Sequence, residues 1–274
     1  MDINITVLTL VKGRNNALLN LVKGLSLNQY NGMELIIVHM NEEICTLPIT
    51  SFPIRSISLF TEEKLPLAKA RNLAISQAKA AYCIFLDVDC IPAADFISVY
   101  AKAFLKSDSL WSGCIRYLRD GFSSDLERSA LDQWSDADPV RSNLNPLPYE
   151  LFWSLNFGCS KSVFNSIGRF DENYQGYGAE DTDFSFMARK KGIQLSNLAA
   201  TAYHQPHPSY DPPLNHLEDI VKNATVFHDK WHRWPMEGWL SKFAELGYIL
   251  WNDKQLILLN LPTQQDIEKY LKKT

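Results

Sequence analysis

The stretch Ile84-Phe85-Leu86-Asp87-Val88-Asp89 decides the fold, because it is an apolar segment that ends in two carboxylates one residue apart. Side chains at the carboxyl end of a strand in an open α/β sheet meet solvent in the crevice where such sheets bind ligands. Two acids this close repel each other unless a cation lies between them. Hard cations such as Mn²⁺ or Mg²⁺ prefer oxygen ligands and can hold phosphate oxygens. Residues 84–89 therefore predict a seat for a metal and a diphosphate, and an acidic turn without a ligand is the plain alternative.

The rest of the chain predicts an α/β fold with a mostly parallel central sheet flanked by helices, because strands and helices alternate in its first part. The expected strands cover residues 3–10, 34–38, 54–59 and 82–86. The expected helices cover residues 15–27 and 66–80, and proline opens the second of them. Residues 107–153 look irregular, and residues 120–148 are a candidate lid. After residue 212 the pattern predicts helices over residues 217–228, 239–259 and 264–273.

A second acidic cluster lies in Tyr174-Gln-Gly-Tyr-Gly-Ala-Glu-Asp-Thr-Asp-Phe184. Gly176 and Gly178 permit backbone conformations that other residues resist, and the acids follow where a helix through Lys191 is expected to begin. The helix macrodipole favours acids in a first turn, so helix capping is the plain alternative. Capping alone does not account for two glycines, two tyrosines and three acids in so short a stretch. We interpret the cluster as catalytic or substrate-binding.

Composition limits the classes of function. The chain has 274 residues and a net charge of −4, and no concentrated basic patch is visible, so we expect no nucleic-acid partner. Its five cysteines have no paired spacing and are interpreted as reduced thiols. We see no basic leader and no apolar run long enough to span a bilayer, so we expect a cytoplasmic protein without its own anchor. A peripheral position at a membrane stays open as an alternative.

Three stretches together resemble a known family. They are Leu67–Ala74 leading into Phe85–Asp89, then Phe157–Lys161 with Ile167–Glu172, and the glycine-rich segment through Glu180 and Asp181. In order and spacing they are similar to the GT-A fold glycosyltransferases of the family 2 type, with a C-terminal half like that of the β-1,4-galactosyltransferases and chondroitin-polymerase-like enzymes. Tyr177 stands where that family usually has a tryptophan.

The resemblance implies a GT-A domain over residues 1–209 and a helical extension over 210–274 that packs on it. Within the domain, residues 1–95 would form the nucleotide-binding half and 96–209 the donor-sugar and acceptor half. The implied activity is transfer of a hexose, with inversion, from a nucleotide-sugar donor, expected to be a UDP-sugar. The implied acceptor is a hydroxyl group of a glycan, as in polysaccharide biosynthesis.

The resemblance also implies roles for single residues. Asp89, helped by Asp87 and His204, would hold Mn²⁺ or Mg²⁺, with His207 as the alternative to His204. Asp181 would be the general base, and Glu180 would orient hydroxyl groups of donor or acceptor. The remaining nucleotide-binding and donor-binding candidates are Val11, Arg14, Arg71, Phe157 and Gly158, and the acceptor candidates are Tyr177 and Trp153.

Several alternatives stay open. Family 2 enzymes usually have an acid at the end of the second strand to bind the base, but here the chain has Val38-His39-Met40-Asn41-Glu42, so Glu42 or Asn41 would have to substitute. Arg14, Arg71 and the two aromatic candidates each have an ordinary structural interpretation as caps, surface ion pairs or core. A non-catalytic nucleotide-sugar-binding homologue is one other class. A phosphatase with the same acidic motif is disfavoured, because Cys90-Ile91-Pro92 follows it.

Overall fold

The central sheet begins with four parallel strands. In the computed structural model, which describes residues 3–122 and 128–272, these strands are adjacent in the order β3-β2-β1-β4. Their bounds are β1 (Ile5–Val11), β2 (Met33–Met40), β3 (Ile54–Leu59) and β4 (Tyr82–Leu86). All four predicted strands are therefore confirmed within a few residues, and the predicted α/β class with them.

Beyond β4 the sheet becomes mixed instead of staying parallel. β8 (Asn156–Ser160) is antiparallel to both β4 and β6 (Leu110–Leu118). β9 (Leu195–His204) is parallel to β6 and antiparallel to β5 (Cys90–Pro92). β7 (Ser135–Ala137) is antiparallel to the C-terminal end of β6. The expectation that residues 107–153 are irregular is wrong for β6, a strand inside the sheet.

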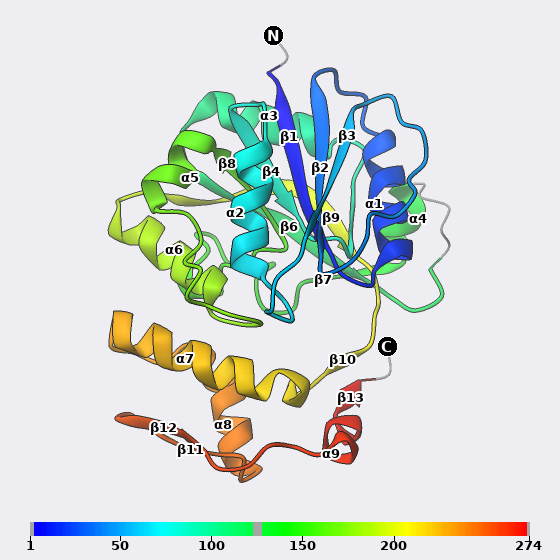
Figure 1. Cartoon of the computed structure of the whole chain (residues 1–274). Helices are drawn as coiled ribbons and strands as arrows, with labels where there is room; N and C mark the ends of the chain where they lie inside the picture. The colour runs from blue at the N-terminus through cyan, green and yellow to red at the C-terminus, as the bar shows by residue number, and fades with distance from the viewer. Residues whose placement is uncertain (1–2, 123–127, 273–274) are drawn as a thin grey trace.

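Helices cover both faces of this sheet. Alternate residues of β4 point to opposite faces, so Ile84 and Leu86 pack with α1 (Asn15–Ser26) and α3 (Phe96–Lys106). Cys83 and Phe85 pack on the other side. The helices on that side are α2 (Leu67–Gln77), α5 (Lys161–Ile167) and α6 (Glu180–Lys190). Figure 1 shows α2 in front of the sheet, with α5 and α6 beside it.

The remaining elements of the sheet domain are short. They are α4 (Arg128–Gln133) and the 3-10 turn Tyr149–Leu151. Part of the candidate lid, residues 123–127, lies outside the described residues.

The C-terminal extension is only partly helical. It contains α7 (Leu217–Trp231) and α8 (Glu237–Glu245), then the hairpin β11 (Ile249–Asn252) and β12 (Gln255–Leu258), and α9 (Gln264–Lys269). The predicted helix over 239–259 is wrong in its second half, because Gly247 turns the chain at a φ of 78° and Asn252 then closes a tight turn. α9 begins at a capping box on Thr263 and is shorter than predicted.

The extension lies against the sheet domain along one edge. Figure 1 shows α7 below α6, with α8, the hairpin and α9 on the far side of α7. β10 (Ser209–Tyr210) pairs with β13 (Leu271–Lys272), which joins the start of the extension to its described end. Within residues 3–122 and 128–272, no helix combines the length and apolar character that crossing a membrane requires.

Candidate active site

A cavity of about 1060 Å³ opens where β4 ends. It brings together most of the residues predicted from the sequence, although they come from distant parts of the chain. The predicted residues that line it are Arg14, Arg71, Asp87, Asp89, Trp153, Tyr177, Glu180, Asp181 and His204.

Three predicted donor-binding residues belong to the core instead. Val11 and Phe157 have no exposed surface, and Phe157 stacks on Phe85 with 4.5 Å between ring centroids. A Cβ atom on Gly158 would lie 2.8 Å from the ring of Tyr100. Helices cover both faces of β8, since Gly158 lies against α3 and Phe157 packs in the core formed with α2, α5 and α6. Ser154 and Leu155, just before β8, line the cavity in their place.

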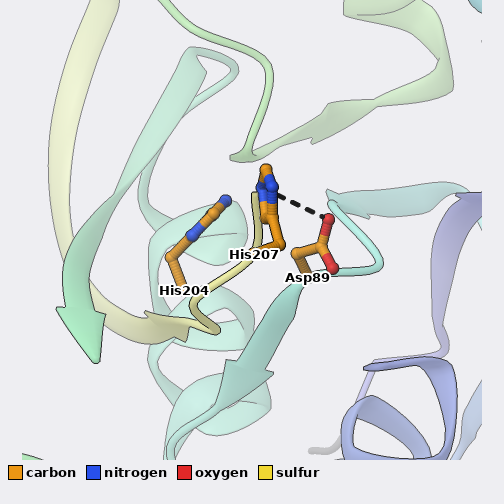
Figure 2. Close-up of side chains that lie close together, drawn as sticks. All are labelled: Asp89, His204 and His207. Carbon is orange, nitrogen blue, oxygen red and sulfur yellow. Dashed lines mark ion pairs between the residues drawn. The ribbon is translucent and has the colours of Figure 1, made fainter. Parts of the chain in front are cut away.

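Asp89, His204 and His207 form a group that could hold a metal ion. One ligand atom of each lies within 4.8 Å of those of the other two, and Figure 2 shows the side chains facing one another. The antiparallel pairing of β5 with β9 places His204 opposite Cys90, and the Gln205 N–H donates to the Asp89 carbonyl at 2.7 Å. The sequence offered His207 only as the alternative to His204, whereas the structure supplies both.

The donor set of this group fits a transition metal better than Mg²⁺. Imidazole nitrogen is a ligand for first-row transition metals, while Mg²⁺ keeps oxygen ligands and water, so one carboxylate with two histidines favours a transition metal over Mg²⁺. Asp87 is not part of the group. Its Oδ1 accepts the N–H of Asp89 at 3.0 Å, and its side chain lines the cavity beside the group.

Burial and neighbouring charges shift the pKa values of two members of this group. Burial and the neighbouring Asp87 raise the pKa of Asp89 to about 6, against the opposing effect of Arg14 and His207. Arg14 Nε and His207 Nε2 lie 3.4 and 3.7 Å from the same oxygen of Asp89. Burial lowers the pKa of His204 to about 4, so its imidazole is neutral at pH 7, as a metal ligand must be.

The second acidic group begins α6. Ala179 precedes the helix at a φ of 70°, and Glu180 is only 5% exposed. One oxygen of Glu180 accepts from Arg71 at 2.9 Å, whereas the other, Oε2, is buried and has no hydrogen-bond partner within residues 3–122 and 128–272. Arg71 also donates to Ser154 Oγ at 2.7 Å, so two N–H groups of this guanidinium hold Glu180 and Ser154, and its predicted contact with a diphosphate stays a prediction.

Asp181 has the character expected of a proton acceptor. Burial and Glu180 raise its pKa to about 7, and Arg71 with the backbone N–H groups of Thr182 and Ser154 only partly opposes this. A base with a pKa near the working pH is the most effective kind. Asp181 lines the same cavity as the metal-binding group.

Asp183, the third acid of the cluster, is structural. It is 1% exposed and is not among the residues lining the cavity. It accepts from Lys230 at 2.9 Å and from the indole N–H of Trp231 at 2.6 Å, and Tyr174 adds a third bond at 3.2 Å. The acid therefore ties α6 to α7.

Asn223 of α7 was missed by the sequence reasoning, although it holds the glycine-rich segment in place. Its amide donates to the carbonyls of Gln175, Tyr177 and Gly178 at 2.9, 3.3 and 2.9 Å, and accepts the Gln175 N–H at 3.1 Å. The sequence could have indicated this role, because Asn223 is a polar residue on the apolar face that Ile220 and Phe227 define in α7.

The two residues proposed to bind the nucleobase of the donor, Asn41 and Glu42, make other contacts. Asn41 adopts a φ of 53°, and its side chain holds the turn at Thr61 and Glu63. Glu42 accepts the N–H of Gly13 at 2.6 Å, which fixes the loop after β1. Neither side chain lines the cavity, so recognition of the nucleobase by Asn41 or Glu42 stays a prediction without structural support.

The described part of the candidate lid is anchored at Trp153. Asp138 and Arg141 form a buried ion pair at 2.8 Å, and the Arg141 guanidinium lies 4.2 Å above the Trp153 ring. One face of Trp153 is thereby covered. Closure of residues 120–148 over a donor remains a prediction.

An open α/β sheet that ends in an acidic motif, with a second acidic pair across a large cavity, is the arrangement of GT-A glycosyltransferases. The chain belongs to glycosyl transferase family 2, whose family model matches residues 6–168. A second model, described as the N-terminal domain of galactosyltransferase, matches residues 140–208. This confirms the resemblance drawn from the three sequence stretches.

Two curated proteins are similar to the chain. A Drosophila melanogaster protein named putative inactive polypeptide N-acetylgalactosaminyltransferase 12 is 27% identical over 181 residues, which cover 60% of this chain and 31% of that protein. The uncharacterized glycosyltransferase YfnE of Bacillus subtilis is 24% identical over 261 residues, covering 76% of this chain and 66% of YfnE. The chain thus spans about a third of the first relative and about two thirds of the second.

Solved structures of S. aureus TarS share the fold. Residues 1–349 of TarS match with a TM-score of 0.54 and 16% identity, over 82% of this chain and 65% of that one. The same part of TarS in complex with UDP matches with a TM-score of 0.55.

Proposed function

We propose that this chain is a metal-dependent, inverting glycosyltransferase that moves a hexose from a UDP-sugar to a hydroxyl group of a glycan. One observation carries the proposal: Asp181 and the group Asp89, His204 and His207 line the same cavity. A base and a cation seat in one cavity are the two parts that such a transfer needs. The UDP bound to TarS, which has this fold, supports the choice of donor.

Asp181, Glu180 and the group that could hold a metal ion each have a separate role in the proposed transfer. A divalent cation held by Asp89, His204 and His207 would stabilise the charge on a departing diphosphate as a Lewis acid. Asp181 accepts the proton of the acceptor hydroxyl as its oxygen attacks the anomeric carbon from the face opposite the diphosphate, and this geometry inverts the anomeric centre. The free Oε2 of Glu180 is available to accept from a sugar hydroxyl.

A metal-dependent binding experiment tests the donor half. Ligands that bind only the folded state raise its stability, so UDP and UDP-sugars should raise the melting temperature in the presence of Mn²⁺ and not with chelator. Asp89→Ala should abolish the shift. Asp253→Ala, at an exposed position in the β11–β12 turn, is the matched control and should keep it. An equal shift with and without Mn²⁺ would contradict the metal-dependent site.

Release of free sugar from the UDP-sugar by the native chain separates an enzyme from a non-catalytic homologue. A homologue that only binds would show the shift and no turnover. Membership in glycosyl transferase family 2 leaves the phosphatase alternative without support.

A further inference from the structure

The C-terminal extension supplies one wall of the cavity. Pro213, Asn215, His216, Met236 and Trp239 all line it, and they lie beyond the part of the chain that the two family models match. At about 1060 Å³ the cavity lies at the upper end of the roughly 300–1,000 Å³ range typical of ligand pockets. The wall and the group that could hold a metal ion line this same space.

The wall is aromatic where it meets the acidic segment. Tyr177 stacks on His216 with 4.6 Å between ring centroids and lies 6.0 Å from the Trp239 ring. All three side chains are partly exposed and line the cavity together with Asp181. Trp153, the other aromatic candidate, has one face covered by Arg141, as Tyr177 has one face covered by His216, and Trp153 is not part of this wall.

The position of this wall is fixed relative to Asp181. A Cβ atom on Gly176 would lie 2.3 Å from the Asp219 carboxylate, and one on Gly178 would lie 2.9 Å from the Met236 sulfur. Glycine suits both positions, because their φ angles of 72° and 103° strain other residues and an added Cβ would have to displace the ends of the Asp219 and Met236 side chains. Asn223 fastens the same segment by hydrogen bonds.

We propose that Tyr177, His216 and Trp239 form the acceptor subsite and bind a pyranose ring of a carbohydrate. This rests on the proposed function, and it assigns the subsite to the extension. The weakly polar C–H groups of a pyranose pack on the electron-rich faces of aromatic rings, and Asn215 and His216 offer hydrogen bonds to its hydroxyl groups. A ring held here lies beside the carboxylate proposed to take its proton.

The test uses saturation-transfer NMR on the full chain with UDP and Mn²⁺ present. The probes are the methyl pyranosides of glucose, galactose, N-acetylglucosamine and N-acetylgalactosamine. We expect at least one to bind the native protein, and Trp239→Leu, which keeps an apolar side chain in the core of the extension, to weaken that binding about tenfold. Trp239→Phe should restore most of it. Trp134→Leu, at a 44% exposed tryptophan outside the cavity, is the control and should have no effect.

Three results would overturn the inference: no glycoside binds, binding survives Trp239→Leu, or Trp239→Leu weakens UDP binding equally. The third result would assign the wall to the donor. If Trp239→Leu does not fold, glycoside binding is measured on His216→Ala, which changes the other ring beside Tyr177. Hydrolysis of the UDP-sugar without acceptor is measured on the same proteins, so failure of the proposed function is seen separately.

Discussion

Replacing Asn223 with alanine should destabilise the fold and loosen the segment that leads to Asp181. The amide has two N–H groups, which serve three carbonyls at 2.9, 2.9 and 3.3 Å, and one oxygen, which accepts at 3.1 Å. We count three full hydrogen bonds, since the 3.3 Å contact shares a proton. Each such bond contributes about 0.5–1.5 kcal/mol net, so the free energy of unfolding should fall by about 1.5–4.5 kcal/mol. The side chain is 1% exposed, so water does not replace these bonds readily.

Urea unfolding measures this loss. The midpoint should fall while the slope with urea stays unchanged, because the same surface becomes exposed. Asn260→Ala is the matched control in the same extension, since this exposed side chain makes one hydrogen bond at 3.5 Å, and it should cost less than about 0.5 kcal/mol. If Asn223→Ala and Asn260→Ala unfold at the same urea concentration, the hydrogen bonds of Asn223 do not stabilise the fold as proposed.

Three further predictions concern the acids and the metal. Asp181→Asn should lower the transfer rate about 10²- to 10⁴-fold with little change in UDP affinity. The transfer rate of the native protein should rise with pH through about 7, because Asp181 loses its proton there. A flat pH profile would show that Asp181 is not the general base. Its raised pKa means that folding favours the protonated form, so its contribution to stability is present at low pH and is lost as pH rises through about 7. Asp181→Asn should therefore unfold at the same or a higher urea concentration at pH 8, and a lower midpoint would mean damage to the fold. His204→Ala and His207→Ala should each raise the Mn²⁺ concentration for half-maximal activity about tenfold or more, and in a metal titration an unchanged value for either would remove that histidine from the group. Lys230→Met should cost about 1–3 kcal/mol in urea unfolding, because it removes the charged donor of the buried Asp183, and an unchanged midpoint would show that the tyrosine and tryptophan donors suffice.

Sequence reasoning found the features that depend on neighbours along the chain. The strands β1 to β4 show as short apolar runs between turn residues, and Asp87 and Asp89 follow directly from the end of such a run. The glycines and acids of residues 174–184 are likewise adjacent. Local pattern was enough to place both halves of the candidate site.

What the sequence could not show depends on pairing between distant segments. β6 contains polar residues and a bulge at Gly113, and it is a strand because β8 and β9 satisfy its backbone from both sides. His207 joins His204 only because β9 pairs with β5 and delivers both residues to Asp89. Phe157 and Gly158 match a family motif, yet they are buried because helices distant in the sequence pack on both faces of β8.

The close approach of Gly176 and Gly178 to α7 and Met236 sets where the chain can be recombined with a relative. A crossover at residue 210 would pair one parent's glycine segment with another parent's helix, and the side chains at positions 219 and 236, which lie against the two glycines, would no longer be matched to that segment. A crossover ahead of Tyr174 transfers the segment, α6 and the extension as one cassette. Exchanging acceptor preference between homologues therefore calls for cassettes that begin before residue 174.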